Sequence, residues 1–177
     1  MTGKDSAVSR AARVRLMVFD VDGILTDGSL HYGAEGESIK TFNVQDGLGI
    51  KLLRQAGVKT AIITARNSPI VAKRAADLGI DHVQQSAHDK KSAFEQLLAH
   101  FGLNADEAGF VGDDWIDLPV LTRAGFAASV PNGRAEVRER AHFVTHAAGG
   151  CGAVREICEF ILRAQGSFEA ALAPYLA

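Results

Sequence analysis

Cysteines, excess charge of one sign and long apolar runs are all scarce in this sequence. Cys151 and Cys158 are its two cysteines among 177 residues. Their separation matches no metal-clip motif, so we expect reduced thiols. The formal net charge of −2 gives no bulk electrostatic reason to expect nucleic acid or an anionic membrane as a partner. No apolar run approaches the ~20 residues of a membrane span. We therefore expect a soluble protein of the cytoplasm.

The sequence also lacks a segment that resembles a leader or a linker. Residues 1–13 are polar and basic without an apolar core, unlike a signal peptide, and we expect them to form a flexible arm. No repeat or low-complexity stretch divides the rest of the chain. Because its length suits one domain with a substantial core, residues 14–177 are expected to form a single domain.

Short aliphatic runs alternate along the chain with segments of helical periodicity. Buried parallel strands are near-continuous aliphatic runs, which predicts strands at 14–19, 58–64, 80–84, 109–111, 126–130 and 143–144. Helices are expected over 48–55, 69–79, 89–101, 116–123 and 153–165, with a further one after Asn132-Gly133. This alternation predicts an α/β fold, a doubly wound, Rossmann-like parallel sheet with helices on both faces.

One segment interrupts that alternation after the first strand. Residues 29–42 carry Gly33 and Gly36 on either side of Ala34-Glu35, with apolar residues on both flanks. This pattern predicts an inserted β-hairpin with a tight turn.

Two acids follow the first aliphatic run. Asp20 ends that run and Asp22 comes two residues later, so both carboxylates can face one site only if the chain curls between them. Gly23 permits such a curl. An Asp-Gly turn that closes a strand is common. However, two acids followed by Thr26-Asp27-Gly28 favour a functional site over a plain turn.

Further polar residues stand at the ends of other expected strands. Thr64 ends one strand, Asp113 follows another, and Lys90 and Lys91 open a helix between them. Ligands bind at the carboxyl ends of parallel strands, so these groups can converge. Clustered carboxylates suit Mg²⁺, and a carboxylate can also act as a nucleophile toward phosphorus. Spacing alone does not decide between the two lysines.

The chain resembles the haloacid dehalogenase superfamily in four segments. Residues 20–28, 62–66, 89–90 and 112–117 are similar, in order, to its four motifs, and together they cover nearly the whole chain. The absence of a cap domain and the segments 42–47 and 149–156 more narrowly resemble the 3-deoxy-D-manno-octulosonate 8-phosphate (KDO 8-phosphate) phosphatases. The resemblance implies an Mg²⁺-dependent phosphatase that forms an aspartyl-phosphate and acts in lipopolysaccharide precursor synthesis.

The resemblance also implies roles for the acids. Asp20 would be the nucleophile and an Mg²⁺ ligand. Asp22 would be the general acid and base, and its backbone carbonyl would bind the metal. Asp113 would complete the protein ligands, while Asp114 and Asp117 would orient them.

Substrate contacts are implied in the same way. Thr64 and Lys90 would act in catalysis by holding the transferring phosphoryl oxygens. The full set of expected substrate-binding residues is Asp22, Asn43, Asp46, Gly47, Lys51, Arg66, Arg74 and Lys90. Arginine suits a sugar acid because its planar fork binds a carboxylate through two hydrogen bonds.

By the same resemblance we expect a homotetramer. Its hairpins would cover neighbouring active sites, because a phosphatase without a cap domain needs another means to exclude water. Gln45, Leu48, Ala65 and Cys151 depart from the family pattern, which leaves the sugar open.

Three other functions stay open. One is an N-acylneuraminate 9-phosphate phosphatase, another is a non-catalytic module of sugar-nucleotide synthesis, and the third is a receiver-like phosphorylation switch. Phosphate release from the competing sugar acid phosphates would separate the first from a KDO 8-phosphate phosphatase. The intact set of Asp20, Asp22, Lys90 and Asp113 argues against a non-catalytic module.

Overall fold

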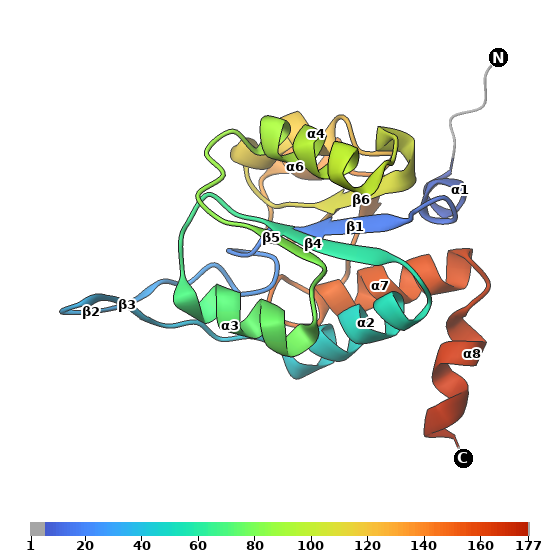
Figure 1. The fold of residues 1–177 in the computed structure, drawn as a ribbon, viewed down its shortest axis with the longest axis horizontal. Coiled ribbons are helices and arrows are strands. Elements are labelled where there is room, and N and C mark those ends of the chain that lie inside the picture. Colours follow the sequence, from blue (N-terminus) through green and yellow to red (C-terminus); the bar gives the residue numbers. More distant parts are fainter. Residues whose placement is uncertain (1–5, 177) are drawn as a thin grey trace.

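A six-stranded parallel sheet forms the middle layer of the protein. The computed structural model describes residues 6–176, and Figure 1 shows the sheet between two layers of helices. Its strands are β1 (Leu16–Phe19), β4 (Lys59–Ile63), β5 (His82–Gln84), β6 (Ala108–Val111), β7 (Phe126–Ser129) and β8 (Phe143–Val144). Their order is β5-β4-β1-β6-β7-β8, and every pairing is parallel. The predicted fold class is confirmed.

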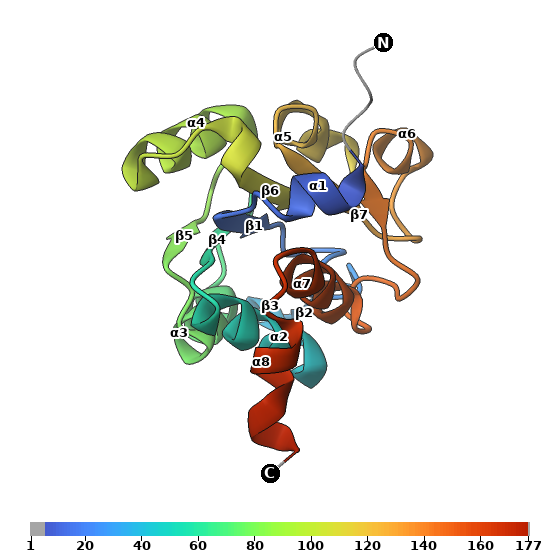
Figure 2. The ribbon, with the colours of Figure 1, turned by 90° about the vertical axis from the view of Figure 1, so that its right-hand side faces the viewer.

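Helices cover both faces of this sheet (Figure 2). One layer holds α4 (Lys90–Phe101), α5 (Leu118–Leu121) and α6 (Ala135–Arg138), and the other holds α2 (Val44–Gln55), α3 (Pro69–Leu78) and α7 (Ala153–Ala164). Met17 and Phe19 of β1 belong to the core beneath α2 and α7, while Leu16 and Val18 belong to the core beneath α4. Successive strand residues point to opposite faces, so β1 is buried on both sides.

Helix α2 begins at Val44, earlier than the residue 48 that the sequence predicted. The Asn43 side chain accepts hydrogen bonds from the backbone of Gln45 and Asp46, so it caps a helix that begins at Val44. Asp46 and Gly47 therefore lie within the first turn of α2 and not before it. The expected helix 116–123 is divided between a 3₁₀ turn, Trp115–Asp117, and α5.

The two ends of the chain contain helices that the sequence did not predict. Residues Ala7–Ala11 form α1, with Ser6 as its N-cap, and Ala11 is buried in the core that also contains α7. The expected flexible arm is therefore wrong for this segment, and its residues 1–5 lie outside the described chain. Beyond α7 come α8 (Phe168–Leu172) and a 3₁₀ turn, Ala173–Tyr175. Another 3₁₀ turn, Ala105–Glu107, precedes β6.

The inserted hairpin is present as predicted. Strands β2 (His31–Gly33) and β3 (Gly36–Ile39) pair antiparallel around the turn Ala34-Glu35, and they project from the body of the domain in Figure 1. Leu30, Tyr32 and Ile39 expose about half or more of their surfaces. Between residues 6 and 176, no helix has both the length and the apolar character needed to cross a membrane.

Candidate active site

Three adjacent strands in the centre of the sheet carry the predicted catalytic residues to one edge. Asp20 follows β1, Thr64 follows β4 and Asp113 comes shortly after β6. These residues line one cavity of about 270 Å³. Its lining consists of Asp20, Asp22, Gly28, Thr64, Ala65, Arg66, Lys90, Asp113, Asp114 and Ile116. The four sequence motifs thus converge, as the strand order requires.

The structure distinguishes the two lysines that spacing left open. Lys90 is the first residue of α4, and its ammonium lies 2.7 Å from Asp20 Oδ1 and 2.6 Å from Asp117 Oδ1. Its side chain is 2% exposed. Lys91 is 44% exposed, and among the described residues its ammonium is paired with Glu95, at 3.8 Å. Lys90 is therefore the lysine of the cavity.

Asp117 holds the acidic loop that follows β6. Its side chain is fully buried, and Oδ2 accepts hydrogen bonds from the backbone N–H groups of Asp113 and Asp114. A Cβ added at Gly112 would lie 2.5 Å from the Asp117 side chain, so only glycine permits this packing. With Lys90 on its other oxygen, Asp117 has the contacts expected of a residue that orients the site.

The carboxylates of the cavity are suited to a divalent cation. Carboxylate oxygens of Asp20, Asp113 and Asp117 lie within 4.8 Å of one another. Burial raises the pKa of Asp20 to about 7, with a further increase from Asp117, although Lys90 opposes both effects. Burial also raises the pKa of Asp113 to about 7, and the charges of Asp117 and Asp114 add to this. Such crowded, oxygen-only donors match the ligands that Mg²⁺ prefers.

Gly23 has a second role beyond the curl that the sequence predicted. Its φ of +93° lies in the left-handed region. In addition, a Cβ at this position would lie 2.2 Å from Asp113 Oδ2. The glycine therefore makes room for the carboxylate that faces Asp20.

Asp22 is joined to the hairpin by a lysine that the sequence analysis missed. Lys40, directly after β3, contacts Asp22 Oδ1 and lies 2.9 Å from Glu37 Oε1. Its side chain is 1% exposed. Arg66 Nε lies 3.8 Å from Asp22 Oδ2. A lysine at the base of an exposed hairpin gives no local sequence signal of burial, so only the tertiary structure reveals it.

The structure places the remaining expected substrate contacts outside this cavity. Asn43, Asp46, Gly47 and Arg74 line a different, narrow hollow between α2 and α3. Asp46 Oδ1 accepts a hydrogen bond from the backbone of Arg155 at the start of α7. In this chain, the four residues therefore lie at the contact between α2 and α3 and not in the carboxylate cavity.

Arg74 and Lys51 have equally local surroundings. The Arg74 guanidinium lies 5.6 Å from the centre of the Phe42 ring and donates a hydrogen bond to the Asn43 carbonyl. Lys51 is exposed and lines a surface hollow together with Arg54. Of the expected substrate contacts, Asp22, Arg66 and Lys90 line the carboxylate cavity.

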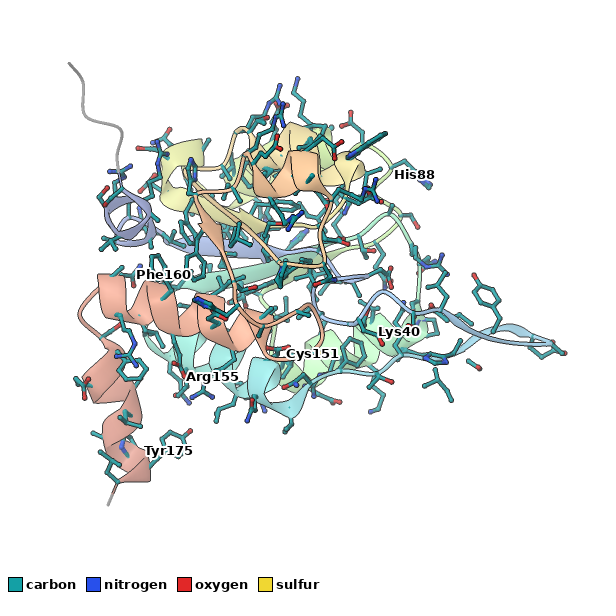
Figure 3. All side chains as sticks on the ribbon, turned by 180° about the vertical axis from the view of Figure 1, so that it is seen from behind. Lys40, His88, Cys151, Arg155, Phe160 and Tyr175 are labelled. Carbon is teal, nitrogen blue, oxygen red and sulfur yellow. The ribbon has the colours of Figure 1, made fainter. Side chains whose placement is uncertain are left out.

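A glycine loop packs against the segment that directly follows Asp22. Gly149 is buried, and a Cβ there would lie 1.7 Å from the Gly23 carbonyl oxygen. Gly150 donates a backbone hydrogen bond to the Ile24 carbonyl. Cys151 follows in the same loop and is exposed (Figure 3). Segment 149–150 therefore packs closely against the segment 23–27 of its own chain.

Comparison with known proteins identifies the family. Residues 48–125 match the family model of the haloacid dehalogenase-like hydrolases. The 3-deoxy-D-manno-octulosonate 8-phosphate phosphatase of Yersinia pestis is 41% identical over 138 residues, which cover 78% of this chain and 74% of the relative. The Escherichia coli K12 enzyme of the same description is 41% identical over 134 residues, 76% of this chain and 71% of the relative. The chain belongs to the KDO 8-phosphate phosphatase family.

Solved structures agree with this membership. The KDO 8-phosphate phosphatase of Moraxella catarrhalis, solved with a magnesium ion, a phosphate ion and KDO, has a TM-score of 0.93 at 44% identity, covering 96% of this chain and 97% of that one. The cobalt-bound enzyme of Haemophilus influenzae has a TM-score of 0.89 at 39% identity, covering 91% and 94%. As a member of the KDO 8-phosphate phosphatase family, the protein is a phosphoric monoester hydrolase of the haloacid dehalogenase superfamily.

Proposed function

We propose that this protein hydrolyses KDO 8-phosphate to KDO and phosphate. The observation that supports this most directly is the cavity in which Asp20 is paired with Lys90 and faces Asp22, Thr64 and Asp113. The relatives that share 41% identity carry this activity in their names. A role in lipopolysaccharide precursor synthesis in the cytoplasm belongs to the same proposal.

In the proposed mechanism, two carboxylates carry out the two steps of hydrolysis. Because Lys90 holds Asp20 Oδ1, the other oxygen of Asp20 is free to attack phosphorus. The bond from phosphorus to the sugar oxygen breaks, and the leaving oxygen takes a proton from Asp22. Water then attacks the phosphorus of the aspartyl-phosphate and gives its proton to Asp22. Phosphate leaves, and Asp20 is restored.

The groups around Asp20 stabilise the charge of the transferring phosphoryl group. Thr64 accepts the backbone N–H of Arg66, so its own hydroxyl hydrogen can be donated to a phosphoryl oxygen. Lys90 supplies a positive charge within hydrogen-bond distance of the nucleophile. Burial would lower the pKa of Lys90, but Asp20 and Asp117 outweigh it and raise that pKa above its ordinary value. The lysine is therefore charged at neutral pH.

Asp20, Asp113 and the backbone carbonyl of Asp22 would hold Mg²⁺ at this edge. When bound, the ion would supply further positive charge to the phosphoryl group, in addition to that of Lys90. The raised pKa values of Asp20 and Asp113 support this assignment, because a cation relieves the same repulsion that a proton relieves.

Arg66 is the residue proposed to recognise the carboxylate of the sugar acid. It lines the cavity, and its Nη2 donates a hydrogen bond to the Tyr32 hydroxyl of the hairpin at 2.8 Å. Its side chain is 36% exposed and lines the cavity, so part of the guanidinium is open to a ligand. A guanidinium that faces a cavity is suited to an anionic substrate.

The proposal includes a homotetramer in which hairpins 29–42 cover neighbouring active sites. Its support is the apolar surface that Leu30, Tyr32 and Ile39 expose. A two-stranded hairpin is marginally stable alone, which favours its burial between chains. Light scattering at micromolar concentration should give the mass of four chains, and a monomer would contradict this part of the proposal.

The first test compares two substrates on one preparation. Mg²⁺-dependent phosphate release from KDO 8-phosphate should exceed release from N-acetylneuraminate 9-phosphate. The opposite preference would identify a nine-carbon sugar acid phosphatase and would make Gln45, Leu48 and Cys151 specificity determinants. Failure on both substrates would favour a non-catalytic module.

A second test addresses the covalent mechanism. Asp20→Asn should lower kcat by more than about 1,000-fold, because the nucleophile is lost. Asp27→Asn is the matched control, since Asp27 is an exposed acid of the same loop and accepts a hydrogen bond from the Ser29 backbone. Near-normal turnover by Asp20→Asn would exclude the aspartyl-phosphate.

A further inference from the structure

Lys40 is a buried charge outside the four motifs that carry the chemistry. It lies where the hairpin joins the domain, as Figure 3 shows. Its side chain is 1% exposed, and its ammonium contacts the carboxylates of Asp22 and Glu37. Burying an unpaired ammonium is strongly unfavourable, so these contacts determine where the side chain lies. Lys40 does not line the carboxylate cavity and is therefore not in a position to touch the phosphoryl group.

The contact with Lys40 makes the two oxygens of Asp22 different from each other. Asp22 Oδ1 accepts a hydrogen bond from the Lys40 ammonium. Oδ2 has no hydrogen bond among the described residues and has Arg66 Nε at 3.8 Å. A general acid and base needs one oxygen available to exchange a proton with the leaving group or water. Oδ2 is the oxygen that meets this requirement.

Glu37 fixes Lys40 from the hairpin side. Its carboxylate lies 2.9 Å from the Lys40 ammonium and 3.5 Å from Arg66 Nη2. Arg66 in turn binds the Tyr32 hydroxyl near the tip of the hairpin. A chain of charged contacts thus runs from the hairpin to Asp22, and Lys40 is its last member before the carboxylate.

We propose that Lys40 is a positioning residue for Asp22, which it holds through Oδ1 so that Oδ2 exchanges the proton in both steps. This inference rests on the proposed role of Asp22 in hydrolysis. It does not depend on which sugar is the substrate. An aryl phosphate with a good leaving group, p-nitrophenyl phosphate, can therefore test it as well.

Lys40→Met keeps most of the side chain and removes its charge. We expect kcat for KDO 8-phosphate to fall about 10–100-fold, the usual effect of losing a group that orients a functional residue, with KM changed less than threefold. With p-nitrophenyl phosphate, the first step needs little help from an acid, whereas hydrolysis of the aspartyl-phosphate still needs Asp22. The variant should therefore release a burst of p-nitrophenolate, up to one per active site, before a slow steady rate.

A double-mutant cycle tests whether Lys40 acts through Asp22. If it does, Lys40→Met should change the residual rate of Asp22→Asn by less than about threefold, because the residue that it orients has already been lost. A loss of the same factor in both backgrounds would overturn the proposal. So would unchanged kcat in Lys40→Met alone.

Two controls separate positioning from folding and from general charge effects. Lys91→Met removes an exposed lysine and should leave kcat unchanged. Tyr32→Phe removes the hairpin contact to Arg66 without changing Lys40. With p-nitrophenyl phosphate, this variant should release no burst of p-nitrophenolate.

If Lys40→Met changes the mass measured by light scattering, Glu37→Gln replaces it as the test variant, since it weakens the contact that holds Lys40 from the hairpin side. A wild-type enzyme that hydrolyses p-nitrophenyl phosphate but no sugar acid phosphate would contradict the proposed substrate while this cycle still decides the role of Lys40.

Discussion

The carboxyl edge of the sheet and the hairpin differ in how their polar groups are held. At the carboxyl edge, Lys90 and Asp117 are almost fully buried, and each has at least two partners. In the hairpin, all three residues of β2 are exposed, and Tyr32 and Ile39 each expose more than half of their surface. The polar groups at the carboxyl edge are thus held in place by contacts within one chain. The apolar surface of the hairpin, by contrast, stays largely exposed in the single chain.

The most severe test of this contrast is to remove the central cation of the carboxyl edge. Lys90→Met leaves Asp20 and Asp117 facing each other without a positive charge. We expect the free energy of unfolding at pH 8, measured with urea, to fall by about 3–5 kcal/mol. Lys91→Met should change it by less than about 0.5 kcal/mol. Equal losses in the two variants would mean that the buried edge is no more sensitive than the surface.

A pair of glycine substitutions compares packing in the two regions directly. A Cβ at Gly149 meets the Gly23 backbone, which a backbone shift must relieve, whereas a Cβ at Gly33 in β2 has its nearest neighbour at 3.7 Å. Gly149→Ala should lower the free energy of unfolding by about 1–3 kcal/mol. It should also lower kcat, because it displaces the segment 23–27 that directly follows Asp22. Gly33→Ala should have little effect on either quantity. A stable, active Gly149→Ala enzyme would show that the segment is not braced by this loop.

The pH dependence of metal binding gives a smaller but more specific effect. The pKa values of Asp20 and Asp113 are about 7 in the folded protein, against an ordinary 3.8. Between these values the folded chain holds protons that the unfolded chain has released, so stability without metal should fall as pH rises from about 4 to 7.

Mg²⁺ competes with those protons, so it should raise Tm more at pH 8 than at pH 5. Scanning calorimetry with and without Mg²⁺ at each pH measures the two increases in Tm. Asp113→Asn should abolish most of the difference, while the hairpin variant Tyr32→Phe should keep it. Equal increments at the two pH values would contradict the assignment of Asp20 and Asp113 as metal ligands.

The convergence of polar residues at the carboxyl edge of the sheet could be predicted from sequence, because these residues stand at the ends of strands. An aliphatic run locates each strand, and parallel topology brings the ends together, so Asp20, Thr64 and Asp113 follow from local patterns. Lys90 and Lys91 could not be distinguished, since both open the same helix. Burial against Asp20 and Asp117 decides between them, and that depends on how α4 packs.

Other features depend on contacts between distant segments. Residues Ala7–Ala11 are too short for a helical period to emerge, and their helix is stabilised by packing in the core that contains α7. Asp46 looks like a free acid next to a glycine. In the structure it accepts a hydrogen bond at the start of α7, more than a hundred residues away. Lys40 was missed for the same reason, because its burial requires the hairpin and the loop of Asp22 together.

The position of β1 has a consequence for how the protein acquires activity as it folds. Leu16 of β1 pairs with Lys59 of β4 on one side and with Ala108 of β6 on the other. Both pairings close long loops, which is slow compared with forming a local helix or hairpin. A partly folded chain with only one of them would lack either Thr64 or Asp113 beside Asp20. During refolding, phosphatase activity should therefore return only when the later of these two pairings has formed. The circular dichroism signal of the helices should return earlier.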